Sequence, residues 1–418
     1  MLKLIETFSG IGAQAQALKN INADFKTVAT ADWEIGAIYA YDIIHNGPQD
    51  LEPYRHHTKD SLVDALQRFN LSNDGKKPLT EKSLRAMSTN QLKRILAAIN
   101  RSNNLIDINT IHANELPSGD ILTYSFPCQD LSAARFWHSG TMGSGIDRDA
   151  NNRSTLLWQV ERILKEYLEI DRKLPRFLLM ENVSDILSYQ NIDNFNEWQA
   201  FLRKLGYVNK VSTLDARNFR VPQSRVRTYM LSVYVGNEKE KVKVKVEDYL
   251  YGNDLELIQL PDSKVNEIGN YLRLDYSIDK YREEAISSTP RFTESREKIY
   301  KNNPILAIDD VPQNGIFART ITTKQDRNPN SGIIEYKNNS LVDWNTHYRN
   351  LTPRECFLLM GFNERQYDDL MRSNVSVREG KRMLADTKLI KLAGNSIVVP
   401  VLEAIFKQVV DLNEMLGN

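Results

Sequence analysis

The sequence predicts an α/β protein: a doubly wound, mostly parallel sheet with a smaller, mainly β domain and a helical insertion. Short apolar runs alternate with helical stretches over the first 235 residues, which is typical of βαβ units. Several runs end in polar or glycine-rich turns, as expected where ligands bind beyond the carboxyl ends of strands. The length of 418 residues favours more than one domain, at about 150 residues each.

The elements of the predicted sheet follow one another along the chain. A glycine turn, Phe8–Gly12, comes after the first strand, and helical stretches follow over Ala13–Asn20 and from Glu34 through about Ile44. The expected strands are Lys3–Thr7, Phe25–Ala31, a segment ending at Asp107 and Ile108, Ile121–Tyr124, Phe177–Met180 and Thr228–Val233.

Two changes of texture suggest the domain organisation. Residues 57–105 interrupt the alternation, and their Thr80–Asn100 stretch has apolar residues at helical spacing, with Ser88 and Gln91 placed for a capping box. After residue 235 the chain has few motifs. We expect a first domain over 1–235 containing the insertion, a second over 236–345, and a segment 346–418 that returns to complete the first, ending in an apolar helix, Ile397–Val410.

Composition excludes several classes of protein. The 54 basic residues balance 54 acidic ones, and 41% of residues are hydrophobic, ordinary values for a folded chain. The two cysteines, Cys128 and Cys356, are too few for a disulfide framework or a structural zinc site and fit a reducing cytosol. No uninterrupted apolar run approaches membrane-spanning length, and the N-terminus does not resemble a signal peptide. We therefore expect a cytoplasmic protein without membrane or metal.

A cysteine turn follows the strand at Ile121–Tyr124. In Phe126–Gln129 the thiol of Cys128 comes directly after a proline, on a rigid turn at the mouth of the sheet. A nucleophilic cysteine needs this exposure and a neighbour that favours the thiolate. A buried, inert cysteine is the alternative, and the tetrapeptide alone leaves both open.

Charged residues accompany two other strands. Glu181 follows Phe177–Met180, where a carboxylate points into the ligand crevice and can hold a proton; a solvated helix-start acid is the alternative. Arg225 and Arg227 alternate before Thr228, so that both guanidinium groups project to one side. The alternative is that these arginines form surface salt bridges. This is less favoured, because Asp215 is the only acid from 203 to 227. The basic cluster comprises Arg203, Lys204, Lys210, Arg217, Arg220, Arg225 and Arg227.

The first turns suit a nucleotide-like ligand. Phe8–Gly12 is a weak signal alone. It gains weight from Asp32, which can bind ribose hydroxyls, and from Trp33, whose indole offers a flat face to a purine. Asp107 can accept a hydrogen bond from an exocyclic amine. The alternatives are helix capping for Asp32, core packing for Trp33 and, for Asn395, a helix cap.

In combination and in this order, the motifs resemble those of the DNA (cytosine-5) methyltransferases of bacterial and phage restriction-modification systems. The resemblance covers most of the chain apart from 57–105 and about 236–318. Asp32 stands where the family more often has glutamate, and the insertion has no assigned role. The matching motifs are Phe8–Gly12, Asp32-Trp33, Asp107, Pro127-Cys128-Gln129, Glu181-Asn182-Val183, Gln223 with Arg225 and Arg227, Arg319–Thr322, Leu351–Cys356, Met360–Phe362 and Gly394-Asn395-Ser396.

The resemblance implies a mechanism. Cys128 adds to carbon 6 of a cytosine flipped out of duplex DNA, Glu181 contacts ring nitrogen 3 and the exocyclic amine, and Arg227, with Arg225 second, neutralises developing charge. Carbon 5 then takes the methyl group of S-adenosylmethionine. The residues expected to hold this cofactor are Phe8, Gly10, Gly12, Asp32, Trp33, Asp107, Ile108, Phe126, Asn395 and Ser396.

The resemblance also implies how DNA is bound. Residues 130–153, with Gly140, Gly143 and Gly145 as hinges, are expected to close over the base, and 236–345 to be the target-recognition domain. Its 236–318 part has 12 basic against 16 acidic residues, so phosphate attraction falls to the basic cluster and to residues after 318. A monomer acting on duplex DNA is expected. The expected DNA contacts are Gln129, Ser132, Arg153, Gln223, Arg319 and Thr320.

Three other functions fit the sequence less well. A tRNA cytosine-5 methyltransferase would use the same chemistry, but Pro290–Thr293 lacks the cysteine of that subgroup's Cys-Phe-Thr element. A dinucleotide-dependent oxidoreductase has no use for Cys128 beside Glu181, and Ala15 replaces the last glycine of its fingerprint. Retention of both Cys128 and Glu181 argues against a catalytically inactive DNA-binding relative.

Overall fold

The computed structural model describes residues 1–127, 146, 156–236, 240–327, 330–337 and 345–417. It divides the chain into two compact units. Unit 1 consists of Met1–Leu214, Val226–Ile258 and Leu402–Asn418, and unit 2 of Asp215–Arg225 and Gln259–Val401. These limits differ from the expected domains, because 236–258 falls in unit 1 and most of 346–418 in unit 2.

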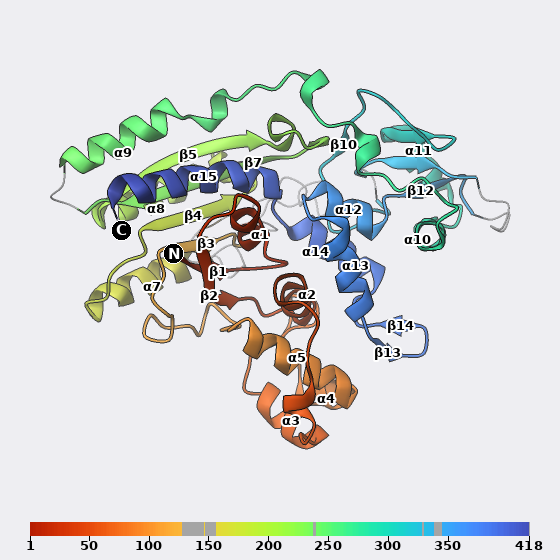
Figure 1. The fold of residues 1–418 in the computed structure, drawn as a ribbon, viewed down its shortest axis with the longest axis horizontal. Helices are drawn as coiled ribbons and strands as arrows, with labels where there is room; N and C mark the ends of the chain where they lie inside the picture. Colours follow the sequence, from red (N-terminus) through yellow and green to blue (C-terminus); the bar gives the residue numbers. More distant parts are fainter. Residues whose placement is uncertain (128–145, 147–155, 237–239, 328–329, 338–344, 418) are drawn as a thin grey trace. The chain divides into compact units, whose positions relative to one another are not determined.

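A six-stranded sheet in the order β2-β1-β3-β4-β7-β5 forms the centre of unit 1 (Figure 1). The first four of these strands are parallel, and β7 runs antiparallel to β4. This is the α/β fold that the alternating pattern predicts. The strands are β1 (Leu2–Thr7), β2 (Phe25–Ala31), β3 (Ile121–Tyr124), β4 (Phe177–Asn182), β5 (Tyr207–Asp215) and β7 (Val226–Tyr234).

Helices cover both faces of this sheet. On one face, α7 (Leu157–Glu169) and α8 (Ile192–Lys204) bury side chains against alternate residues of β3 and β4, such as Tyr124 and Met180. On the other, α1 (Ala13–Asn20) and α15 (Val399–Leu416) lie next to each other (Figure 1), and Asn20 donates a hydrogen bond to Glu403. The alternation of side chains along each strand produces these two apolar faces. In α9 (Glu240–Gly252), Tyr249 bonds Asp411 of α15.

The insertion is helical. It contains α3 (Lys59–Leu66), α4 (Glu81–Arg85) and α5 (Thr89–Arg101), and α5 packs on α3 and on α2 (Ile35–Asn46). The Thr80–Asn100 stretch is helical, as expected, and its second half begins at the predicted cap: the Ser88 hydroxyl accepts a hydrogen bond from the Gln91 amide.

Unit 2 combines short strands with helices, so the expectation of a mainly β domain over 236–345 is wrong. One sheet has the order β12-β11-β8-β9, and β10 pairs with β6. The strands are β6 (Gln223–Ser224), β8 (Ile305–Ile308), β9 (Val311–Pro312), β10 (Ala318–Arg319), β11 (Ile333–Glu335), β12 (Tyr348–Asn350), β13 (Ser376–Arg378) and β14 (Lys381–Arg382). The helices are α10 (Asp279–Ser287), α11 (Glu294–Asn302), α12 (Pro353–Leu359), α13 (Glu364–Ser373) and α14 (Asp386–Asn395).

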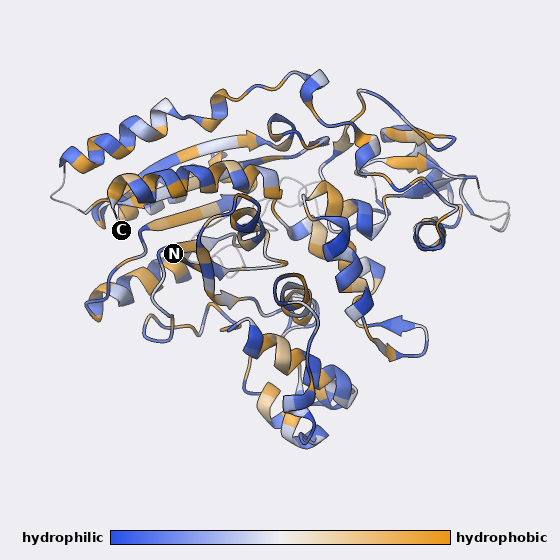
Figure 2. Cartoon of the chain, viewed as in Figure 1, coloured by the Kyte–Doolittle hydropathy of each residue, from blue (hydrophilic) through white to orange (hydrophobic). Residues whose placement is uncertain are grey.

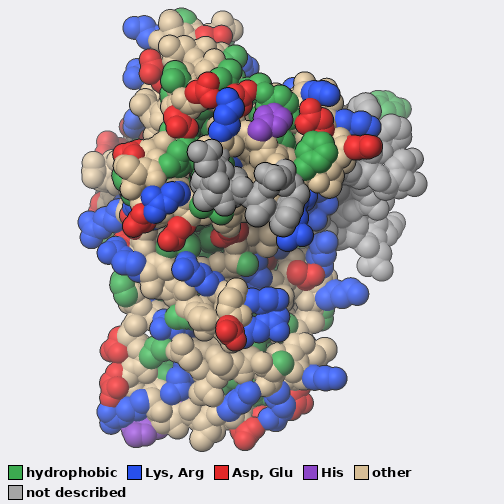
Figure 3. Space-filling model, turned by 90° about the vertical axis from the view of Figure 1, so that its right-hand side faces the viewer, with side chains coloured by type: hydrophobic (Ala, Val, Ile, Leu, Met, Phe, Trp, Pro, Cys, Tyr) green, Lys and Arg blue, Asp and Glu red, His purple; other side chains and the backbone are tan. Residues whose placement is uncertain are grey.

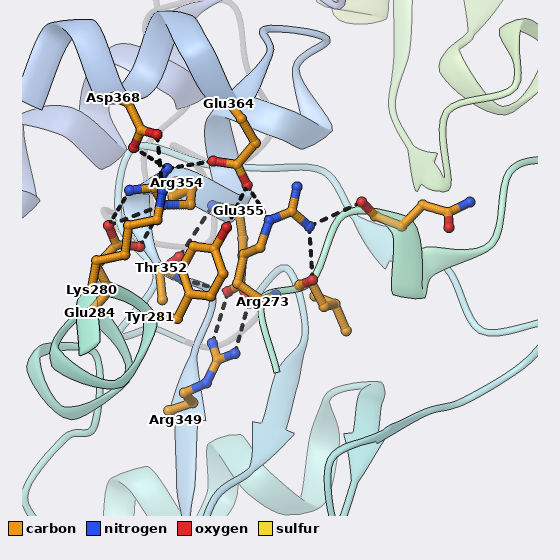
Figure 4. A network of polar contacts seen from close by, with 12 residues as sticks. Arg273, Lys280, Tyr281, Glu284, Arg349, Thr352, Arg354, Glu355, Glu364 and Asp368 are labelled. Atoms are coloured by element: carbon orange, nitrogen blue, oxygen red, sulfur yellow. Dashed lines mark hydrogen bonds and ion pairs between the residues drawn. The ribbon is translucent and has the colours of Figure 1, made fainter. Parts of the chain in front are cut away.

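A buried ion-pair network holds unit 2 together (Figure 4). Arg349 and Glu355 meet at 2.8 Å with both side chains fully buried. Burial alone would raise the pKa of Glu355, but the Arg349 guanidinium holds that pKa below its usual range. Nearby, Arg354 bonds Glu284 of α10 at 2.8 Å and also carboxylates of α13. The Leu351–Cys356 motif therefore joins three helices and a strand by charge pairing.

One helical stretch among the described residues, Asp386–Leu416, is long and apolar enough to cross a membrane. Its most apolar window is 61% buried inside the protein. This is weak evidence for a membrane span, because core helices have the same length and composition. Figure 2 shows the same apolar character in the strands of the unit 1 sheet and in α15, whereas α10 and α13 are largely hydrophilic.

Candidate active site

The turn after β1 has an unusual backbone. Phe8, Gly10 and Gly12 all have positive φ values, of 56°, 52° and 77°. At Gly12 a β-carbon would lie 2.2 Å from Nε2 of His45, so only glycine fits. At Gly10 a β-carbon would meet nothing within 4 Å among the described residues. The turn thus packs on α2 at one glycine and leaves space at the other.

Asp32 ties this turn to the end of β2. Its Oδ2 accepts a hydrogen bond from the Gly10 amide at 3.0 Å, and its Oδ1 accepts one from the Glu34 amide at 2.9 Å. The half-buried Trp33 follows at once. The predicted residues of the first two turns are therefore brought together at the carboxyl ends of β1 and β2.

Asp107 is buried beside them in unit 1, but it does not end a strand. In the segment that leads to Asp107, Asn104 makes a single β-bridge, to Thr30 of β2. Asp107 begins a turn by accepting hydrogen bonds from the backbone and side chain of Asn109. The segment that ends at Asp107 is therefore not the predicted strand, because one bridged pair of residues is too short for a strand. Ile108 is 5% exposed and belongs to the apolar core.

Two buried polar side chains, Glu6 and Tyr41, and the partly buried His45 lie beneath the glycine turn. Glu6 of β1 accepts hydrogen bonds from the Ala15 amide at 3.1 Å and from the Tyr41 hydroxyl at 2.5 Å. Burial raises the pKa of Glu6 to about 7. His45 contacts the Ile11 carbonyl through Nε2 at 3.0 Å, and burial lowers its pKa to about 4. The sequence does not predict this group, whose only local signal is a glutamate inside an apolar strand.

These turns have the chemistry to hold an adenosine-containing cofactor. Such a ligand presents vicinal hydroxyls, an exocyclic amine and a flat purine. The carboxylates of Asp32 and Asp107 are hydrogen-bond acceptors, Trp33 is an aromatic face, and Gly10 leaves room at the turn. The side chains at these turns therefore fit S-adenosylmethionine.

Glu181 and Arg227 form an ion pair on neighbouring strands. β4 and β7 pair so that Glu181 lies opposite Tyr229, two residues from Arg227. Nε of Arg227 is 3.5 Å from Oε1 of Glu181, and the side chains are only 17% and 12% exposed. The predicted acid and the predicted cation are thus adjacent and largely desolvated, which strengthens their interaction.

Asn182 connects Glu181 to the cysteine turn. Its side chain is buried, and Nδ2 donates a 3.1 Å hydrogen bond to the carbonyl of Phe126, two residues before Cys128. The same side chain accepts a hydrogen bond from the Val183 amide. Asn182 was not among the predicted site residues, although its place directly after Glu181 is a signal.

Several predicted site residues lie outside the described part of the chain. They include the nucleophile Cys128 and, apart from residue 146, the segment 130–153 with its three glycines. The predicted DNA contacts among them are Gln129, Ser132 and Arg153.

Gln223 and Arg225 have structural partners within unit 2. Gln223 is fully buried; its amide donates to the Leu359 carbonyl and accepts from the Ile321 amide. Arg225 is 4% exposed and donates to backbone carbonyls, including those of Ile321 and Ser396 at 2.8 Å. Both side chains are buried and bound to backbone, so the structure gives each a structural role. That Gln223 touches DNA and that Arg225 neutralises charge in the reaction stay predictions.

Arg319 and Thr320, two of the predicted DNA contacts, lie in unit 2. Arg319 on β10 is exposed and donates to Oδ1 of Asn303, while the Thr320 hydroxyl donates to the Ser224 carbonyl. Arg319 can therefore reach a ligand in solution, whereas Thr320 is half-buried.

The Gly394–Ser396 motif ends α14 rather than beginning the last helix. A β-carbon at Gly394 would lie 2.4 Å from the carbonyl carbon of Thr322, so the glycine permits a close approach between α14 and the segment after β10. Asn395 is exposed and Ser396 is buried.

The described residues show no metal cluster. No group of three or more His, Cys, Asp or Glu side chains within them is arranged to hold a metal ion. On the face drawn in Figure 3, Lys and Arg side chains are spread out with Asp and Glu among them.

Comparison with known proteins places the chain in a family. Residues 67–411 match the C-5 cytosine-specific DNA methylases. The type II methyltransferase M2.ScrFI of Lactococcus lactis subsp. cremoris is 29% identical over 98% of this chain and 99% of its own length, and the orphan methyltransferase M.SssI of Spiroplasma monobiae is 29% identical over 98% and 97%. The fold is similar to that of S. pombe Dnmt2 methyltransferase, with a TM-score of 0.61 and 19% identity over the whole of both chains. The chain therefore belongs to the C-5 cytosine-specific DNA methylases, enzymes that transfer a methyl group from S-adenosylmethionine to carbon 5 of cytosine in DNA.

Proposed function

We propose that this enzyme methylates cytosine within a specific duplex DNA sequence, through a covalent bond between Cys128 and a base flipped out of the helix. The observation that carries the proposal is the Glu181–Arg227 pair, joined through Asn182 to the backbone that precedes Cys128. Extrusion of the base costs a few kcal/mol, which DNA contacts must offset. Arg319 is proposed as one such contact, because it is exposed.

Glu181 and Arg227 have complementary tasks in this proposal. The Cys128 thiolate adds to carbon 6 as the Glu181 carboxyl group passes a proton to ring nitrogen 3. This leaves a neutral enamine, whose electron pair is available at carbon 5. Arg227 keeps the carboxyl group in place and offsets negative charge that develops on the ring carbonyl. Once carbon 5 carries the methyl group, water takes its proton, the C5–H electron pair re-forms the C5–C6 double bond, and Cys128 leaves carbon 6 as the thiolate. Return of the nitrogen 3 proton to Glu181 restores the aromatic ring.

S-adenosylmethionine, when bound, supplies the methyl group as an electrophile. Phe8, Gly10 and Gly12 are proposed to line its site, Asp32 to bind the ribose hydroxyls, Trp33 to stack on the purine, and Asp107 with Ile108 to face the purine edge. Phe126, Asn395 and Ser396 remain proposed contacts. The enzyme is further proposed to act as a monomer in the cytoplasm of a bacterium or phage-infected cell, like the bacterial and phage sources of the relatives.

Mass spectrometry of nucleosides from duplex DNA and from tRNA, each incubated with enzyme and S-adenosylmethionine, tests the proposal. We expect 5-methylcytosine in the DNA alone, its loss with Cys128→Ser, and a strong reduction with Arg227→Lys, which keeps the charge but not the planar guanidinium. Methylation confined to tRNA would instead support the alternative with the same chemistry. Undiminished turnover by Cys128→Ser would exclude the covalent mechanism.

A further inference from the structure

The helical insertion contacts the proposed cofactor site directly. Within it, Ser72 is fully buried and pairs with the backbone that follows β2. Its amide donates to the Trp33 carbonyl at 2.7 Å, and its carbonyl accepts from the Ile35 amide at 2.9 Å. The Ser72 hydroxyl closes its own turn by donating to the Lys77 carbonyl at 2.6 Å. The insertion therefore holds the segment carrying Trp33 on both sides of Glu34.

The end of the insertion makes a second contact with β2. Asn103 and Leu105 exchange backbone hydrogen bonds with Thr30, at 3.2 and 2.9 Å. Between them, the side-chain carbonyl of Asn104 accepts from the Asp32 amide at 3.2 Å and from the Ile106 amide at 2.8 Å. Asn104 is only 6% exposed. One amide group thus joins the turn that carries Asp32 to the one that carries Asp107.

A third contact fixes the carboxylate of Asp107 itself. Nδ2 of Asn70 donates a hydrogen bond to Oδ2, while Oδ1 accepts from the backbone and side chain of Asn109 at 3.0 and 2.8 Å. A carboxylate has about four lone-pair sites, so the donors that the described residues supply occupy three. The remaining site is on Oδ2, the oxygen that Asn70 holds.

We propose that Asn70 is a positioning residue for the purine end of the cofactor site, and that the insertion raises affinity for the cofactor in this way. The proposal rests on the proposed function, in which Asp107 faces the purine edge. Asn70 orients Oδ2 so that its remaining lone pair accepts the exocyclic amine of the adenine. Without Asn70 the carboxylate can rotate, and the amine loses a fixed partner.

The test is the dissociation constant of S-adenosylhomocysteine, compared with that of its analogue without the exocyclic amine. Both are measured by calorimetry on the full-length enzyme. For Asn70→Ala we expect binding of S-adenosylhomocysteine to weaken roughly tenfold, the scale of one hydrogen bond to a charged group. The analogue should lose less than about threefold, and kcat at saturating cofactor should stay within about twofold, because Asn70 contacts no reacting atom.

Two further variants separate positioning from folding. Asn100→Ala removes an amide from α5 that donates to the Tyr54 hydroxyl, and it should leave both dissociation constants unchanged. Asn70→Asp places a second carboxylate beside Asp107, so its loss of affinity should exceed that of Asn70→Ala at pH 8 and shrink as the pH is lowered.

Equal losses for the two ligands in Asn70→Ala, or wild-type affinity for S-adenosylhomocysteine in that variant, would overturn the inference. A wild-type enzyme that binds S-adenosylhomocysteine but does not prefer it to the analogue would also overturn it, because Asp107 would then not accept the amine. Failure of the wild-type enzyme to bind either ligand would instead contradict the proposed function.

Discussion

Glu6→Gln should make the protein more stable at high pH. Glu6 is completely buried beneath the glycine turn, and its pKa is raised from 4.5 to about 7. A raised pKa means that the fold disfavours the charged carboxylate. The resulting penalty is absent below about pH 4.5, grows as the pH rises to about 7, and is constant above that value. Each pKa unit corresponds to about 1.4 kcal/mol, so the full penalty is about 3 kcal/mol.

Glutamine avoids this penalty because it stays neutral, and its carbonyl can accept the Ala15 amide as Glu6 does. The difference in unfolding free energy between Glu6→Gln and wild type should therefore rise by about 2–3 kcal/mol from pH 5 to pH 8. His45 has the opposite pH dependence. Its pKa is lowered to about 4, so it lowers the unfolding free energy as the pH falls below about 6.5. Both proteins contain His45, so its contribution cancels in the difference.

Urea denaturation at pH 5, 6, 7 and 8, followed by fluorescence and circular dichroism, measures this difference. Glu169→Gln, at an exposed position on α7, is the matched control and should show no such trend. A difference between Glu6→Gln and wild type that is constant or falls with pH would refute the reasoning.

Three other variants test contacts elsewhere. Glu355→Gln should cost about 3–5 kcal/mol of stability in chemical denaturation, because Arg349 stays buried without its partner charge; a loss below 1 kcal/mol would contradict this. Asn182→Ala removes the hydrogen bond to the Phe126 carbonyl and should lower kcat roughly 5- to 100-fold with KM for the cofactor unchanged; an unchanged kcat would remove its positioning role. Gly394→Ala should destabilise the protein by about 1–3 kcal/mol, seen as a lower Tm, since its β-carbon overlaps the facing backbone; an unaltered Tm would show that this backbone yields.

The sheet could be predicted from the sequence because its strands carry strong local signals. Ile121–Tyr124 is buried along its whole length, and such a continuous apolar run is typical of a central parallel strand. By contrast, charge alternates with valine before Asp248, a pattern that suits strands. This segment is α9, in which Val246 and Leu250, four residues apart, are buried while Val244 is 45% exposed. Helical spacing of the buried residues decides the structure there.

The partners of buried polar residues were harder to predict than the ion pair of the candidate site. Glu181 and Arg227 were recognised from their motifs, and they form the ion pair of the site. Gln223 and Arg225 belong to the same motif, but their partners lie about 100 residues or more along the chain. A residue's type does not reveal such partners, because folding alone brings them together. The position of Asn70 beside Asp107 escaped notice for the same reason.

Duplex DNA that contains 5-fluorocytosine at the target position tests the central claim most directly. Fluorine cannot leave carbon 5 as a proton does, so the covalent intermediate should accumulate. With S-adenosylmethionine present, denaturing electrophoresis should show a protein–DNA adduct for the wild-type enzyme and none for Cys128→Ser. An equal yield of adduct from both proteins, or efficient methylation of ordinary cytosine without any trapped adduct, would contradict the account.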